Sequence, residues 1–261
     1  MRPPARAAAA AAAVALAHVV AACGSGVGDE AEGGAGGRAA GARTRQVIVL
    51  LDLSASQTPA MLQESRRFLD GLVERLWFGD RVVLLEVHRA GVRDAARRWA
   101  DTLPRLMDPT HVSTRDRTRL AGARDAVRSV ARAVFESARA GRAPHTDLFA
   151  TLHVAAEYAR DGGDRETVLV LLSDMLQSAG GIEMDGLRRM PPDGWIARQK
   201  AAGTLPDLRG ACIVVVGADA TSEQGVAVRD FWLEYFRAAG ARLAAENYRL
   251  LAPDAGEIGC D

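Results

Sequence analysis

Five side chains with oxygen donors stand where predicted strands end or a predicted helix begins. They are Asp52, Ser54, Ser56, Thr146 and Asp174. The first three directly follow an apolar run and alternate along the chain, so in an extended segment one carboxylate and two hydroxyls share a side. Carboxylate and hydroxyl oxygens are hard donors that suit Mg²⁺, Mn²⁺ or Ca²⁺ and suit zinc or copper poorly. We therefore predict a divalent-cation site, with Mg²⁺ as the first choice and Mn²⁺ and Ca²⁺ as alternatives.

The elements that must position these residues alternate between strand and helix. Continuous apolar runs rich in β-branched residues indicate buried parallel strands, and apolar residues at helical spacing indicate helices between them. Strands are predicted at 46–51, 81–87, 96–103, 167–172, 211–216 and 248–251, and helices at 59–77, 118–140, from about 146 onward, at 195–202 and after Ser222. This order predicts an α/β fold: a doubly wound, mainly parallel sheet with helices on both faces.

The five residues should meet at one edge of that sheet. In an open α/β sheet, ligands bind beyond the carboxyl ends of the strands, where the strand order reverses. Asp52 and Asp174 each follow a buried strand, and Thr146 opens a helix. Each feature alone also occurs in ordinary structure, where Asp-x-Ser-x-Ser forms a turn and a threonine such as Thr146 caps a helix. Their convergence on one edge favours the cation site.

The complete set resembles the metal-ion-dependent adhesion site of von Willebrand factor A domains, over residues 45–252. The resemblance implies that Ser54, Ser56 and Thr146 coordinate the cation directly, while Asp52 and Asp174 act mostly through water. It also implies an open position for an acidic residue of a partner, and one antiparallel edge strand, which would be the polar segment 96–103. Many relatives have glycine before the threonine, where this chain has His145.

The N-terminal segment has the pattern of a secretory signal. Arg2 and Arg6 precede an apolar run from Ala7 to Ala22, too short to span a bilayer comfortably. The run ends in Val-Ala-Ala-Cys, which resembles the lipobox of bacterial lipoproteins and implies lipidation of Cys23. We expect a signal peptide at 1–22, a lipidated cysteine with a flexible Gly/Ala-rich tether at 23–44, and one folded domain at 45–261. The chain would then be exported and held in the cell envelope by its lipid anchor.

Charge and cysteine content restrict the remaining possibilities. Removing residues 1–22 takes away two arginines and no acidic residue, which leaves 31 basic and 33 acidic residues. That balance does not suggest nucleic acid as a partner. Cys212 and Cys260 would form one disulfide in an oxidising compartment, or remain two free thiols. The connection 177–209 is longer than two strands need, and we expect it to be an elaboration on the ligand-binding side.

Three functions remain open from the sequence. The first is a non-enzymatic module that binds a carboxylate of an unknown protein partner through the cation. The second is a metal-dependent hydrolase of the phosphoester type, for which His145 is the nearby candidate base. The third is a structural subunit of an envelope transport or secretion assembly, in which the site is vestigial. We predict the first.

Overall fold

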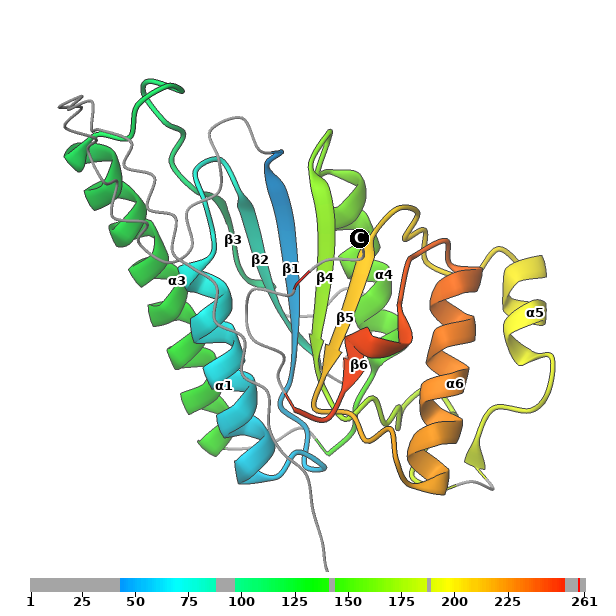
Figure 1. Cartoon of the computed structure of the whole chain (residues 1–261). Coiled ribbons are helices and arrows are strands. Elements are labelled where there is room, and N and C mark those ends of the chain that lie inside the picture. The colour runs from blue at the N-terminus through cyan, green and yellow to red at the C-terminus, as the bar shows by residue number, and fades with distance from the viewer. Residues whose placement is uncertain (1–42, 88–96, 141–143, 187–188, 252–257, 259–261) are drawn as a thin grey trace, which may run out of the picture. The chain divides into compact units, whose positions relative to one another are not determined.

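The centre of the fold is a six-stranded sheet with the strand order β3-β2-β1-β4-β5-β6 (Figure 1). The structure is a computed structural model, and it describes residues 43–87, 97–140, 144–186, 189–251 and 258. The strands are β1 (Arg45–Asp52), β2 (Arg81–Val87), β3 (Arg97–Thr102), β4 (Glu166–Leu172), β5 (Cys212–Val216) and β6 (Tyr248–Arg249). Of these strands, only β3, on one edge, runs antiparallel to its neighbour. The predicted doubly wound, mainly parallel sheet is confirmed, with the antiparallel strand on the expected edge.

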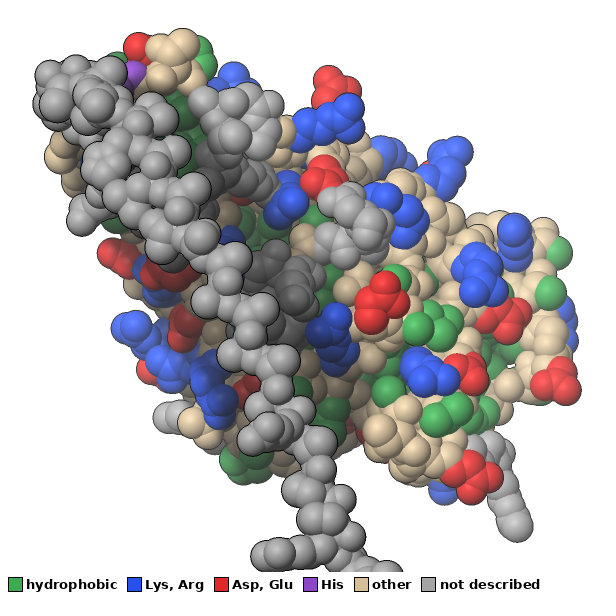
Figure 2. Space-filling model, viewed as in Figure 1, with side chains coloured by type: hydrophobic (Ala, Val, Ile, Leu, Met, Phe, Trp, Pro, Cys, Tyr) green, Lys and Arg blue, Asp and Glu red, His purple; other side chains and the backbone are tan. Residues whose placement is uncertain are grey.

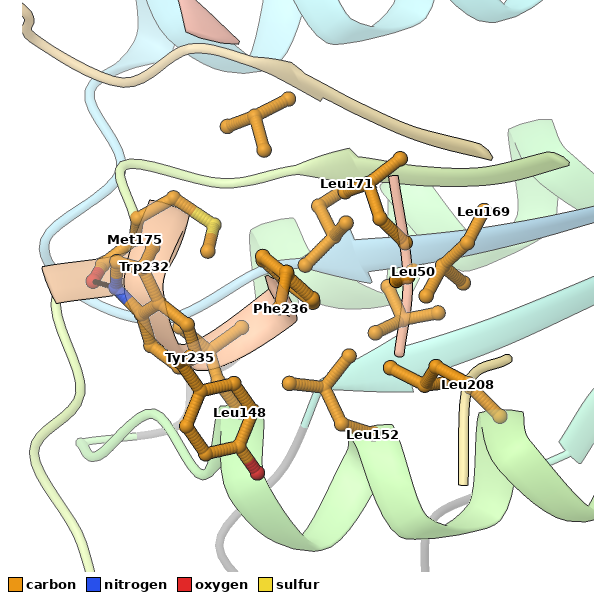
Figure 3. Packing of buried hydrophobic residues seen from close by; sticks show 14 of the residues in the cluster. Leu50, Leu148, Leu152, Leu169, Leu171, Met175, Leu208, Trp232, Tyr235 and Phe236 are labelled. Carbon is orange, nitrogen blue, oxygen red and sulfur yellow. Dashed lines mark hydrogen bonds between the residues drawn. The ribbon is translucent and has the colours of Figure 1, made fainter. Parts of the chain in front are cut away.

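Helices cover both faces of the sheet (Figure 1). They are α1 (Pro59–Glu74), α3 (Thr114–Ala140), α4 (Leu148–Arg160), α5 (Trp195–Ala201) and α6 (Glu223–Ala238), with a short 3₁₀ turn, η2, at Ala245–Asn247. Alternate residues of β1 face opposite layers, as the pleat requires. Val47, Val49 and Leu51 pack with α1 and α3, whereas Ile48 and Leu50 pack with α4 and α6. Figure 3 shows this second core, where Leu50, Leu169 and Leu171 lie beside Leu152, Phe236 and Trp232.

Most predicted boundaries are met within one or two residues, and the larger differences are in α1, α3 and β6. Helix α3 begins four residues early, because Ser113 and Asp116 exchange side-chain and backbone hydrogen bonds in the manner of a capping box. Helix α1 ends at Glu74, and the backbone N–H of the next residue, Arg75, donates to the carbonyls of Leu72 and Val73. Strand β6 is only two residues long. None of these differences moves a predicted site residue.

The long connection between β4 and β5 starts at the carboxyl edge of the sheet. Gln177 and Ser178 bond to the segment before α4, and the Gln224 amide of α6 donates to the Met184 carbonyl. The chain then runs through α5, which packs against α6, before it enters β5. Its first part therefore remains near the predicted site, and its second part forms an outer layer on α6.

The predicted signal peptide, Cys23 and the predicted tether up to residue 42 lie outside the described residues, as does Cys260. Within the described part of the chain, no helix combines the length and the apolar character that a membrane crossing needs.

Candidate metal centre

The strand order reverses between β1 and β4, and both predicted carboxylates come from the ends of these two strands. Leu51 of β1 pairs with Leu172 of β4, so Asp52 is level with Ser173, one residue before Asp174. Parallel strands lie about 4.8 Å apart, which brings the two chain segments into side-chain contact. The reversal creates the crevice in which doubly wound folds bind their ligands. The site is thus located where the topology predicts one.

The Asp52 carboxylate is buried and held by three donors. One oxygen accepts the backbone N–H of Ser54 at 3.0 Å. The other accepts the Ser173 hydroxyl at 2.6 Å and the Gln57 amide at 3.4 Å. Asp52 itself is only 2% exposed. These contacts fix the orientation of a carboxylate that lies between two strands.

The two serines extend from Asp52 toward Asp174. The Ser54 and Ser56 hydroxyl oxygens lie 2.9 Å apart, and Ser56 lowers the pKa of Asp174, which burial raises. Ser54 is buried, whereas Ser56 is exposed. The structure therefore joins Asp52, Ser54 and Ser56 in one hydrogen-bonded group with an outer, solvent-facing end, and Asp174 follows the end of the neighbouring strand β4.

Thr146 is held through its backbone by the loop that follows β4. Its N–H donates to the Ser178 hydroxyl at 2.8 Å, and its carbonyl accepts the Ser178 N–H at 2.9 Å. The N-cap of α4 is Asp147, whose carboxylate accepts the Ala150 N–H at 3.1 Å. Thr146 is only 2% exposed. Because Asp147 performs the capping, Thr146 is not the N-cap of the helix, and its hydroxyl is left free of that role.

The loop after β4 has an uncommon backbone. Met175 adopts a left-handed conformation with a φ of 64°, a region that non-glycine residues rarely occupy. Its carbonyl accepts the Trp232 indole N–H at 2.9 Å, as Figure 3 shows, and its own N–H donates to the Ser173 hydroxyl at 2.9 Å. Such strain persists only where the surroundings hold it, and it often accompanies functional sites.

A buried glutamine ties this loop to the start of α4. The Gln177 side-chain carbonyl accepts the Leu148 N–H at 2.7 Å, and its amide donates to Asp147 and to the Ala179 carbonyl. Gln177 is fully buried. Ser173, Met175, Gln177 and Ser178 were not among the predicted site residues. Of these four residues, only Ser173 could have been suspected from the sequence, because it directly precedes Asp174.

The electrostatics of the cluster favour a cation. Burial raises the pKa of Asp52 to about 6, and the nearby Asp174 carboxylate contributes to the rise, while hydrogen bonds from Ser173 and Ser54 oppose it. Burial also raises the pKa of Asp174. Two carboxylates held close together out of water repel each other, and a dication between them would offset that repulsion.

The donor set fits a hard dication. It consists of two carboxylates and three hydroxyls, and Mg²⁺ and Ca²⁺ prefer such oxygen ligands. No group of three or more His, Cys, Asp and Glu side chains that could hold a metal occurs in the described ranges. His145, the candidate base for hydrolysis, is half-buried and makes no hydrogen bond to Asp52 or Asp174 among the described contacts. The cluster is thus suited to binding through oxygen atoms.

The predicted disulfide is described at one end only. Cys212 is fully buried in β5 and takes part in a disulfide. Cys260 lies outside the described residues, so its pairing with Cys212 stays a prediction.

Comparison with known proteins gives only distant likenesses. No protein-family model matches the chain, and no curated protein matches it. Among solved structures, it is similar to proximal thread matrix protein 1 from the mussel byssus (16% identity, TM-score 0.36, covering 67% of this chain and 38% of that one). It is also similar to an aerotolerance-related membrane protein from Bacteroides fragilis (15%, TM-score 0.40, 81% and 92%). A third is a von Willebrand factor type A structure from Catenulispora acidiphila (14%, TM-score 0.37, 77% and 44%).

The chain spans less than half the length of the first and third of these proteins. The fold assignment rests on the molecule's own strand order, parallel register and two helical layers. These features place the chain in the doubly wound α/β class.

Proposed function

We propose that this chain is a non-enzymatic binding module that recognises an acidic group of a protein partner through a divalent cation. The cation would be held by Asp52, Ser54, Ser56, Thr146 and Asp174, with Mg²⁺ as the first choice. When bound, it would supply an electrophilic centre for an incoming carboxylate. The observation that carries the proposal is that Asp52, with Ser54 and Ser56 bonded beside it, and Asp174 follow the two neighbouring strands between which the strand order reverses.

The composition of the cluster supports a carboxylate as the partner group. Three of the five donors are neutral hydroxyls, so a dication is less than fully neutralised where Asp52 and Asp174 act through water, as the resemblance implies. Ser56, at the outer end, is exposed, which gives a partner side chain access from solvent. A positively charged group would be repelled by the same cation. The partner is therefore expected to offer an Asp, a Glu or a C-terminal carboxylate.

The proposed location is the bacterial cell envelope. There the lipid on Cys23 would hold the protein, and residues 24–44 would separate the domain from the membrane surface.

Affinity capture from envelope extract tests the proposal. The immobilised protein should retain a partner in the presence of Mg²⁺ and release it on addition of EDTA. Asp52→Asn removes one buried charge with little change of shape, and this variant should capture nothing above background. Asp125→Asn, which alters an exposed ion pair with Arg128 on α3, is the matched control and should capture the partner normally. Capture that survives both EDTA and Asp52→Asn would overturn the proposal.

A further inference from the structure

Tyr248 has a buried hydroxyl that the fold leaves without a partner. The residue is 3% exposed, and its hydroxyl oxygen is the one buried side-chain nitrogen or oxygen of the described residues that forms no hydrogen bond. Leaving a buried polar group unpaired costs about 1–3 kcal/mol, so a tyrosine in place of a phenylalanine at such a position calls for a physical reason.

The backbone of Tyr248 lies two residues below the site in the sheet. Leu50, Leu171, Val215 and Tyr248 form one row across β1, β4, β5 and β6. All four side chains belong to the core beneath α4 and α6. Asp52 is two residues beyond Leu50 and therefore faces the same side of the sheet. The tyrosine thus belongs to the layer that contains the site, about two strand spacings, or roughly 10 Å, from β4.

Three charged groups act electrostatically on the Tyr248 phenol, and one of them is the site carboxylate of Asp174. Burial raises the pKa of Tyr248, and the Asp174 carboxylate raises it further, while Arg229 lowers it and Asp219 raises it. Asp219 already accepts hydrogen bonds from the backbone and hydroxyls of Thr221 and Ser222. Arg229 pairs with the adjacent Asp230.

Asp174 has acceptor capacity remaining. Among the described contacts, its Oδ1 oxygen accepts the Leu176 N–H at 3.0 Å. A carboxylate has about four lone-pair positions, so one remains for a further donor even beside a cation. A phenol hydroxyl is a good donor, and one water molecule can connect a donor and an acceptor that are too far apart for direct contact.

We propose that Tyr248 is a positioning residue of the cation site. Its hydroxyl donates a hydrogen bond to a bridging water, which donates in turn to Asp174 and holds that carboxylate in the orientation the cation needs. This inference rests on the proposed cation site. It adds a residue from β6, the far edge strand, to a site otherwise built from the ends of β1 and β4 and the start of α4.

Titration calorimetry with Mg²⁺ on the metal-free protein is the first test. Tyr248→Phe removes only the hydroxyl and should weaken Mg²⁺ binding about tenfold, the lower end of the effect of outer-shell groups on metal sites. Tyr235→Phe is the matched control, because Tyr235 is an equally buried tyrosine of the same core, and its hydroxyl points toward α4 in Figure 3. This variant should bind Mg²⁺ as the wild type does.

A spectroscopic readout separates positioning from a purely structural role. The chain has three tyrosines, so protein labelled with 3-fluorotyrosine gives three fluorine resonances, assigned with the Tyr→Phe variants. Mg²⁺ should shift the Tyr248 resonance and leave that of Tyr158 in place, because Tyr158 lies on α4 at the other end of the sheet, where its carbonyl accepts the Gln46 amide. A structural role alone would change the melting temperature of metal-free Tyr248→Phe and leave its Mg²⁺ affinity unchanged.

The outcomes distinguish the role of Tyr248 from the proposed function. If the wild type binds Mg²⁺, Asp52→Asn does not, and Tyr248→Phe binds like the wild type with no fluorine shift, only the role of Tyr248 is overturned. If the wild type binds no Mg²⁺, the cation site is wrong and the role of Tyr248 falls with it. A tenfold loss in Tyr248→Phe alone, with normal binding by Tyr235→Phe, supports the inference.

Discussion

The Ser173 hydroxyl donates a hydrogen bond of 2.6 Å to the Asp52 carboxylate and thereby joins the ends of β4 and β1. The same hydroxyl oxygen accepts the N–H of Met175, the residue in the left-handed conformation. One serine thus orients a proposed cation ligand and fixes the loop that carries the other carboxylate.

Ser173→Ala should destabilise the protein and weaken Mg²⁺ binding. The substitution removes a donor from a buried carboxylate and leaves that charge less well satisfied, which should lower the free energy of unfolding by about 1–3 kcal/mol near pH 7. Urea unfolding measures the change. Ser137→Ala is the control, because that hydroxyl donates only to the Val134 carbonyl within α3, and its loss should change stability by less than about 0.5 kcal/mol. Equal effects of the two substitutions would contradict the role of Ser173.

The stability of the metal-free protein should fall as the pH rises from about 5 to about 7.5. The pKa of Asp52 is raised to about 6 in the folded state, so the folded protein holds its proton more tightly than the unfolded chain does. The stability that this proton contributes is complete below the unfolded pKa and is lost as the pH rises through about 6. The expected loss across this interval is about 1.5 kcal/mol.

Urea unfolding at several pH values in EDTA, with Asp52→Asn beside the wild type, checks this expectation. The variant has no carboxyl proton to lose at this position and should show a flatter profile. Added Mg²⁺ should stabilise the wild type more at about pH 7.5 than at about pH 5, because protons compete with the cation for the carboxylates. An Mg²⁺ effect that is largest at the acidic end would argue against the proposed ligands.

Trp232→Phe should disturb the site from the opposite side of the core. The indole N–H is the partner of the Met175 carbonyl, and without it the left-handed conformation loses one of its supports. We expect the free energy of unfolding to fall by about 1–3 kcal/mol and Mg²⁺ affinity to fall with it. Trp195→Phe is the comparison, since Trp195 is half-buried and belongs with Trp232 to the aromatic cluster around Phe149. If Trp195→Phe weakens Mg²⁺ binding as much, the effect belongs to the cluster as a whole and not to the Met175 contact.

Export and lipidation can be tested separately from the metal site. Cells that express the full chain with radioactive palmitate should produce a labelled protein in the membrane fraction, because Cys23 follows the apolar run directly. Cys23→Ser should abolish the label, whereas Cys212→Ser should retain it. Label that persists in Cys23→Ser would show that the lipobox assignment is wrong.

The elements could be predicted from the sequence, whereas the hydrogen-bond network between them could not. Strands β2 and β4 lie within one residue of their predicted bounds, because continuous apolar runs of this length are typical of strands buried on both faces. The two carboxylates were predicted because each lies within two residues of the end of such a run. Gln177 and Trp232 could not be predicted, because their roles depend on hydrogen bonds to residues that approach only in the folded chain. The left-handed backbone of Met175 had no signal, since methionine rarely adopts it.

A calorimetric titration of Mg²⁺ into the metal-free protein tests the proposed cation site most directly. We predict one bound Mg²⁺ per chain in the wild type and in Asp125→Asn, and none in Asp52→Asn at the same concentrations. Absence of binding in the wild type, or equal binding in Asp52→Asn, would contradict the proposed site.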